Sequence, residues 1–269
     1  ETDNIHISDN TISSFRSNSN IDLAPSTDSG VLVRTLNNPN AYGTTGNDNF
    51  GQAIASDGNL AIVGVKEEDS AGSINPGKAY IFNITTGALV RTLNNPNAYG
   101  TSQIDYFGHS VAISGNYAIV GTYSEDDADG INSGKAYIFN VNSGVPLHTL
   151  DNPNAYSTSA NDRFGSSVAI SGNYAIVGAY QEDDAGGSGG SGSSSGKVYI
   201  YNVTSGALVH TLDNPNAYGT VQQDYFGFSV AISGNSAIVG AYQEDDASGL
   251  FSGKVYIYNV TSGALVHTL

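Results

Sequence analysis

The chain has 269 residues, of which 33 are glycine and only 13% are charged, a composition that favours short strands and tight turns over helices. Its formal net charge of −16 repels phosphate backbones and anionic lipid surfaces, so no nucleic-acid partner is expected. Its apolar runs are far shorter than the roughly 18 residues that span a bilayer, so membrane insertion is not expected. The absence of cysteine excludes a disulfide framework and thiolate metal sites.

The first thirty residues differ from the rest of the chain. Asn4 to Ser26 alternates short apolar runs with Asn, Ser and Pro, which predicts extended strands or a linker over residues 1–30. Such a segment has little core of its own. We therefore expect it to be a docking segment that packs only by pairing with another chain.

Residues 31–269 spell one unit four times. The dipeptide Phe-Gly recurs at steps of 57, 57 and 62 residues, each time after the motif Asn-Pro-Asn-Ala-Tyr, at Phe50-Gly51, Phe107-Gly108, Phe164-Gly165 and Phe226-Gly227. The longer third step reflects a Gly/Ser-rich insertion, Gly186 to Ser195, which we place in a surface loop. Repetition at this period predicts a repeat architecture, with units at about 50–93, 107–150, 164–212 and 226–269.

Each unit reads as four strands. In the second unit the apolar, β-branched segments are His109–Ser114, Tyr117–Tyr123, Lys135–Val141 and Val145–Leu150. Gly115 and Asn116 form a tight hairpin turn between the first two. The segments are almost continuously apolar, as expected when both faces of a sheet are covered. We predict an all-β fold, a β-propeller of four-stranded antiparallel blades after an extended N-terminal segment, with a solenoid of stacked hairpins as the alternative.

The stretch "FGFSVAISGNSAIVGAYQEDD", followed by "SGKVYIYNV", resembles the FG-GAP repeat of integrin α-chain propellers and of bacterial and viral surface proteins. Two features depart from that family. The third letter of "GAP" is occupied by Lys66, Tyr123, Tyr180 and Tyr242. Calcium-binding members carry an Asp-x-Asp-x-Asp-Gly loop between the first two strands, where this chain has "SGN". The resemblance therefore implies the fold but no calcium site at that connection.

The phase of the repeat bears on the number of blades. The units begin after a segment like a fourth strand, Val31 to Leu36, and stop at another, Ala264 to Leu269. Closed propellers often complete one blade with strands from both ends of the chain, which removes exposed edges. We expect four blades of a larger ring, with a closed four-bladed ring as the alternative.

Thirteen of the 25 acidic residues lie in four clusters between the second and third strands, beginning at Glu67, Glu125, Glu182 and Glu244. Ca²⁺ binds carboxylate and carbonyl oxygens, so these loops are candidate calcium sites. The candidate ligands are Glu125, Asp126, Asp127, Asp129, Glu182, Asp183, Asp184, Glu244, Asp245 and Asp246. The alternative is a solvated acidic rim, partly neutralised by exposed pairs with Lys78, Lys135, Lys197 and Lys254.

Other repeated residues have structural explanations. An Asp lies two positions before the Phe of each Phe-Gly, at Asp48, Asp105, Asp162 and Asp224, and we expect it to cap the turn by accepting backbone N–H groups. The Phe is expected to fill the core between blades, and the Gly to allow close backbone approach. The tyrosines of the Asn-Pro-Asn-Ala-Tyr loops are candidate partner contacts, or pack over the blade edge: Tyr42, Tyr99, Tyr156 and Tyr218.

An enzyme is not expected, because nearly every polar residue recurs once per unit whereas an active site needs a unique constellation. The segment "NTISS" near the N-terminus and the "NPNAYGT" loops resemble virion structural and fibre-like proteins of tailed phages that infect marine bacteria. That resemblance implies a virion surface protein that contacts other virion subunits, copies of itself or a host receptor. The alternative is an extracellular FG-GAP adhesion protein on a bacterial surface. No cofactor is required by either.

Overall fold

The computed structural model describes residues 7–8, 11–12, 20–22, 32, 34–39, 47–69, 75–96, 104–126, 131–153, 161–183, 194–215, 223–246 and 249–269. Its regular structure in these ranges is entirely β. Within them, no helix is long and apolar enough to cross a membrane.

The strands form four sheets of four strands each, preceded by two pairs. The pairs are β1 (Ile7–Ser8) with β2 (Thr11–Ile12), and β3 (Asn20–Asp22) with β4 (Thr35–Asn37). The first sheet holds β5 (Ala53–Asp57), β6 (Leu60–Val65), β7 (Lys78–Asn83) and β8 (Leu89–Asn94). The second holds β9 (Ser110–Ser114), β10 (Tyr117–Thr122), β11 (Lys135–Asn140) and β12 (Pro146–Asp151). The third holds β13 (Ser167–Ser171), β14 (Tyr174–Ala179), β15 (Lys197–Asn202) and β16 (Leu208–Asp213). The fourth holds β17 (Phe226–Ser233), β18 (Ser236–Ala241), β19 (Lys254–Asn259) and β20 (Leu265–Thr268).

Each sheet is an antiparallel meander in chain order, which is the topology of a propeller blade. The first two strands meet at a two-residue turn, as in the pairing of Ser114 with Tyr117 around Gly115 and Asn116. Gly115 adopts a φ of 55°, which glycine reaches without steric cost. The predicted all-β architecture of four-stranded blades is confirmed.

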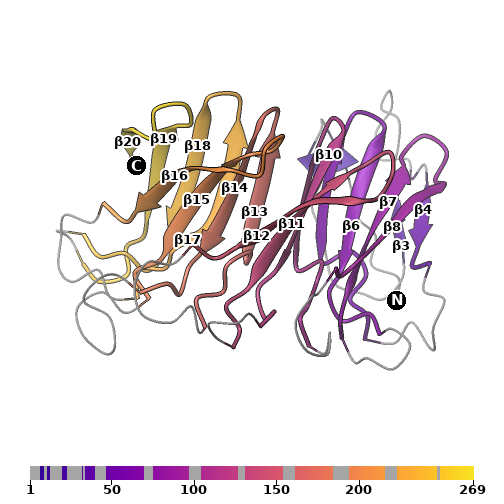
Figure 1. Cartoon of the computed structure of the whole chain (residues 1–269), viewed down its shortest axis with the longest axis horizontal. Helices are drawn as coiled ribbons and strands as arrows, with labels where there is room; N and C mark the ends of the chain where they lie inside the picture. Colours follow the sequence, from indigo (N-terminus) through magenta and orange to yellow (C-terminus); the bar gives the residue numbers. More distant parts are fainter. Residues whose placement is uncertain are drawn as a thin grey trace.

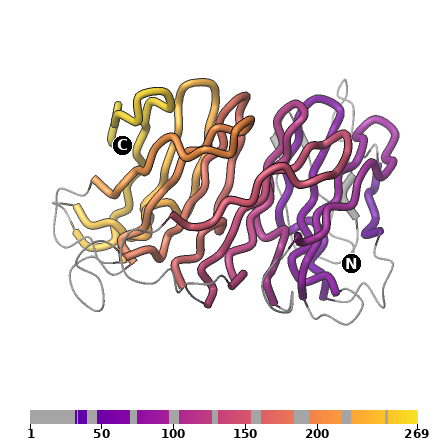
Figure 2. The backbone as a smooth tube through the Cα atoms, in the orientation of Figure 1, coloured from indigo at the N-terminus to yellow at the C-terminus, as the bar shows by residue number. Residues whose placement is uncertain are grey.

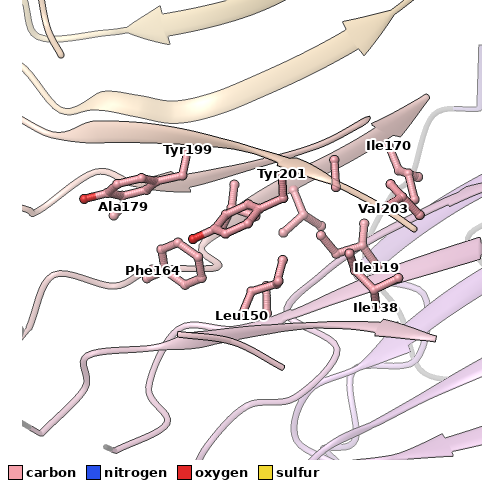
Figure 3. Close-up of a cluster of buried hydrophobic side chains, with 13 residues drawn as sticks. Ile119, Ile138, Leu150, Phe164, Ile170, Ala179, Tyr199, Tyr201 and Val203 are labelled. Atoms are coloured by element: carbon pink, nitrogen blue, oxygen red, sulfur yellow. The ribbon is translucent and has the colours of Figure 1, made fainter. Parts of the chain in front are cut away.

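The blades stack face to face, and each of the first three buries both of its faces. We call the face toward the preceding blade the front face and the face toward the following blade the rear face. Along β10, Ala118 and Val120 on the front face pack against the first blade, while Ile119 on the rear face packs against the third. Figure 3 shows this second core, where Phe164 and Tyr201 meet Ile119, Ile138 and Leu150. The nearly unbroken apolar strands of the sequence follow from this double burial.

The four blades follow one another in a row, with the first and fourth at opposite ends (Figure 1). The trace in Figure 2 shows the same open order, from indigo near the N-terminus to yellow at the C-terminus. At the start of the row, Leu36 of β4 is 1% exposed and packs with Phe50 and Val63 of the first blade. It occupies the place that Leu93 of the first blade takes against the second.

The N-terminal strands pair within the chain. β3 and β4 pair antiparallel with each other, and so do β1 and β2. These strands thus pair within the chain, and docking of residues 1–30 on another chain stays a prediction. The alternation of Asn and Ser with short apolar runs does not indicate the pairing of β3 with β4, because these strands are not adjacent in the sequence.

Candidate functional site

The Phe-Gly dipeptide is the junction between consecutive blades. Phe107 is fully buried, and its backbone N–H donates to the carbonyl oxygen of Pro76 in the preceding blade at 3.1 Å. A Cβ added to Gly64 would lie 2.0 Å from the carbonyl oxygen of Gly108, and one added to Gly108 would lie 2.3 Å from that of Lys78. The predicted roles of Phe as a core residue and Gly as a point of close approach are confirmed at this junction.

The same junction recurs between later blades, and serine strengthens it. Ser110 donates its hydroxyl to the Gly165 carbonyl oxygen, and Ser167 donates to that of Gly227, each at 2.7 Å. On the outer strands, the Arg91 guanidinium and the His148 imidazole each reach a carbonyl oxygen in the next blade, of Asn142 and Thr204 respectively. Both side chains reach an equivalent carbonyl oxygen of the next blade, which explains why Arg and His interchange at this position of the repeat.

One glutamate of each acidic cluster is buried rather than solvated. Glu125 is fully buried and accepts a hydrogen bond from the Tyr137 hydroxyl at 2.5 Å. Glu68 accepts from the Lys78 ammonium at 2.6 Å and from the Tyr80 hydroxyl at 2.5 Å. The other blades repeat the arrangement, with Glu182 bonded to Tyr199, and Glu244 bonded to Lys254 and Tyr256. The expectation of a wholly solvated acidic rim is wrong for these four glutamates. Their side chains are fully buried against the third strand of each blade.

The lysines are also less exposed than expected. Lys78, Lys135 and Lys197 are buried, and Lys254 is half-buried. Lys197 pairs with Asp213 at 2.6 Å, and Lys135 pairs with the equivalent Asp151. Their ion pairs are thus part of the sheet edge rather than loose surface contacts, and an unpaired partner would cost more than the surface value.

Burial changes the pKa values of Glu68 and Glu125. Desolvation raises the pKa of Glu125 to about 8, against the hydrogen bond from Tyr137, which lowers it. Desolvation likewise raises the pKa of Glu68, opposed by Lys78 and Tyr80. The pKa of Tyr137 is raised by burial and by the neighbouring Glu125 charge. One oxygen of each of Glu68, Glu125 and Glu244 is buried without a hydrogen-bond partner.

The remaining described acids stabilise their loops. The carboxylates of Asp126, Asp183 and Asp245 accept backbone N–H groups of Asn132, Ser194 and Phe251 at 2.7–2.8 Å. Asp246 accepts from Gly249 at 3.0 Å. Asp127, Asp129 and Asp184 lie outside the described residues. Within the described ranges, no group of three or more acidic or histidine side chains could hold a metal ion, and calcium binding by the complete loops stays a prediction.

The Asp before each Phe-Gly holds the preceding loop closed. Asp105 is 4% exposed and accepts the side-chain amide of Asn95 at 2.9 Å. The other three copies bond in the same way at 2.8–2.9 Å: Asp48 with Asn38, Asp162 with Asn152, and Asp224 with Asn214. The expected structural role therefore includes a side-chain partner that the sequence did not indicate. Tyr42, Tyr99, Tyr156 and Tyr218, inside these loops, lie outside the described residues.

A row of rings and cations crosses the blades where the second strands end. We call it the aromatic ladder; its members are Lys66, Tyr106, Tyr123, Arg163, Tyr180, Tyr225 and Tyr242. Tyr106 and Tyr123 stack at 5.6 Å between ring centroids, and Tyr225 and Tyr242 stack at 5.5 Å. Between blades, Lys66 lies over the Tyr106 ring at 5.4 Å and Arg163 over the Tyr123 ring at 5.0 Å.

The ladder continues into the fourth blade, where Tyr180 contacts Tyr225 at 5.6 Å and Phe228 at 5.3 Å. His109 contacts the Tyr123 ring edge, and burial, with Lys66 and Arg163 nearby, lowers the pKa of His109 to about 4. The imidazole is therefore neutral at physiological pH, and its Nδ1 is buried without a partner. Most of the ladder is half-buried, and Tyr242 is 47% exposed. Rigid aromatic side chains of this kind contribute much of the binding energy at protein contact surfaces.

Comparison with protein families identifies the repeat. A family model described as the FG-GAP repeat matches residues 41–82, 98–139, 155–201 and 217–258, more than half of the chain. The chain belongs to the FG-GAP repeat family. No curated protein matches it. Among solved structures, the computationally designed protein Ika8 is similar, with 13% sequence identity and a TM-score of 0.43. The alignment covers 81% of this FG-GAP chain and 60% of the designed one.

The aromatic ladder arises where this chain departs from the FG-GAP pattern. Tyr123, Tyr180 and Tyr242 occupy the third letter of "GAP", a departure visible in the sequence. Their partners Tyr106, Arg163 and Tyr225 each directly precede a Phe-Gly. A signal existed, since Tyr or Arg occurs there in three of four FG-GAP copies. The contacts of these side chains with the neighbouring blade could not be predicted from the sequence.

Proposed function

We propose that this FG-GAP chain is a non-enzymatic virion surface or appendage protein that displays its propeller for particle structure or host attachment. Its partners would be other virion subunits, copies of itself or a host surface receptor. The aromatic ladder is the observation that best supports a binding role. It joins seven side chains, of Tyr, Lys and Arg, along one end of the blades through ring stacking and cation–π contacts.

The hydrogen bonds of the repeated carboxylates support a non-enzymatic role. The repeated carboxylates accept hydrogen bonds within the scaffold, as Glu125 does from Tyr137 and Asp105 does from Asn95. A catalytic acid or base needs an open position beside a substrate, whereas these groups are buried. We therefore place binding rather than chemistry at the exposed surface.

The alternative is a bacterial cell-surface FG-GAP protein that binds a ligand in adhesion. The ladder favours a binding role equally in this setting, so location must separate the two. Antibodies against the recombinant chain, used for immunogold electron microscopy of virions and of cells from the source, would do so. Regularly spaced label on virions supports the virion proposal, and label confined to the cell envelope supports the alternative. Label on neither overturns both.

A second experiment tests the ladder itself. Fluorescently labelled chain is incubated with host cells, and bound fluorescence is measured by flow cytometry. The variant Tyr180→Ala removes a ladder ring at the end of β14, and we expect at least fivefold weaker binding. Tyr174→Ala removes a half-buried tyrosine from the other end of the same strand and serves as the control. Equal binding by both variants would exclude the ladder as the contact surface.

A further inference from the structure

The lysine that begins the third strand of a blade lies within reach of two carboxyl groups. In the first blade, the Lys78 ammonium contacts the buried Glu68 at 2.6 Å. In the third blade, the equivalent Lys197 ammonium contacts Asp213 of the outer strand, also at 2.6 Å. Because the two blades share one strand register, these placements show that the same lysine side chain can reach either an inner glutamate or an outer aspartate.

The outer contact is built into the pairing of the strands. Lys197 of β15 stands directly opposite Asp213 of β16, and Lys135 of β11 stands opposite Asp151 of β12, which it also contacts. Side chains at such positions lie close together on one face of a sheet. The lysine side chains are only 3% and 5% exposed, whereas their aspartates are 62% and 66% exposed. Each carboxyl group therefore meets a desolvated amine on one side and solvent on the other.

A buried glutamate lies beside each of these lysines. Glu125 in the second blade and Glu182 in the third are both fully buried. Desolvation raises the pKa of Glu125 to about 8, opposed by the hydrogen bond from Tyr137 and by the nearby charge of Lys135. A carboxyl group with a pKa close to the ambient pH can both accept and give a proton. Each of the two blades thus holds an amine, a carboxyl group in contact with it, and a proton carrier.

We propose that these pairs, Lys135 with Asp151 and Lys197 with Asp213, condense into intramolecular amide cross-links that join the third and fourth strands of their blades. The lysine Nζ attacks the aspartate Cγ, so that a C–N bond forms and a C–O bond breaks. The ammonium group supplies both protons of the water that leaves, and the buried glutamate of the same blade carries them to the leaving oxygen. The condensation needs no oxidant, cofactor or second substrate. The exposed side of the aspartate gives the water a path to solvent.

The cross-links would tie down the strands with the most exposed side chains in these blades. β12 and β16 are outer strands in which most side chains are exposed, and each is hydrogen-bonded to a single neighbouring strand of its sheet. Edge strands of this kind separate from a sheet more easily than central ones, because only one side of their backbone is paired. A covalent bond to the third strand would hold them whatever the aromatic ladder binds, so this inference does not rest on the proposed function.

Mass spectrometry of the complete, denatured chain tests the proposal. We expect an intact mass below that of the sequence by two water molecules, and no tryptic cleavage after Lys197, because its amine is acylated. Lys197→Arg should reduce the loss to one water. Lys66→Arg is the matched control, since Lys66 pairs only loosely with Glu67 at 3.6 Å, and it should keep the loss of two. A chain with the full mass of its sequence would overturn the proposal.

Two further variants separate amide formation from other losses of water. Asp213→Asn should lose one water and one ammonia, because a carboxamide releases ammonia when the amine attacks it. A loss of two waters from this variant would place the dehydration elsewhere and exclude the cross-link. Glu125→Gln should lose one water only, since the third blade keeps its own proton carrier and reports that the chain has folded. An undiminished loss of two waters would show that Glu125 carries no proton in the reaction.

Discussion

The third and fourth blades carry nearly the same strands but differ in what covers them. β15 and β19 both read Lys-Val-Tyr-Ile-Tyr-Asn, yet the first five residues of β15 are buried, whereas in β19 only the two tyrosines are. Both tyrosines point to the front face, which a preceding blade covers in each case. The difference lies on the rear face. Identical sequence therefore buries different side chains according to the neighbouring blade.

The largest expected difference concerns the rear-face isoleucines. Ile176→Ala should lower the free energy of unfolding by about 3 kcal/mol, because it leaves a cavity in a fully buried site. Ile238→Ala should lower it by less than about 1 kcal/mol, because the side chain is already 42% exposed. Urea titration of both variants measures these losses. Equal losses would contradict the difference in cover.

The junction glycines sharpen the same comparison. Gly178→Ala should cost about 2–3 kcal/mol of stability, since the added Cβ meets a backbone carbonyl oxygen of the fourth blade at 2.1 Å. Gly240→Ala should be nearly neutral, because the Cβ meets only a serine hydroxyl that can rotate away. Thermal unfolding of the two variants tests this. A destabilised Gly240→Ala would mean that β17 itself, and not a following blade, requires the glycine.

The burial of Glu125 predicts that the free energy of unfolding depends on pH. The pKa of Glu125 rises from 4.5 to about 8 on folding, so the folded chain binds more protons than the unfolded chain between these values. Stability should therefore be greatest below pH 4.5 for this group and fall as the pH rises to 8, by about 2 kcal/mol or more.

Glu125→Gln keeps an acceptor for the Tyr137 hydroxyl and should remove this loss. Urea midpoints measured from pH 5 to pH 9 would show a flatter profile for the variant than for the native chain. An unchanged slope would mean that Glu125 remains ionised when buried, with a lysine compensating its charge.

The smallest effect is expected in the aromatic ladder. Arg163 covers the Tyr123 ring, whereas no described cation covers Tyr242 at the end of the row. Arg163→Gln should cost about 0.5–1 kcal/mol, the usual strength of an exposed cation–π contact. Tyr242→Leu should cost no more, and the two effects should add, because the sites lie in different blades. A much larger loss for Arg163→Gln would indicate that its bond to Gln181 matters more than the ring.

Much of the fold was predictable because the repeat reports it four times. The strands, the two-residue turn at Gly115 and Asn116, and the burial of Phe107 all follow from local pattern and spacing. The acidic clusters were misjudged because a run of Glu and Asp looks alike whether it is solvated or buried. Glu125 is buried through Tyr137, twelve residues away, and no local signal marks that pairing.

The sequence by itself determined the unit: four strands, a tight turn, and a Phe-Gly dipeptide at each junction. These depend on apolar periodicity and on backbone angles that glycine adopts readily, which are properties of neighbouring residues. Only the tertiary structure decided how units meet, and so which carboxylates are buried, which rings stack into a ladder, and which rear face stays uncovered. Contacts between blades join residues that are distant in the sequence, such as Phe107 with Pro76 and Ser167 with Gly227, and identical units acquire different environments from their place in the row.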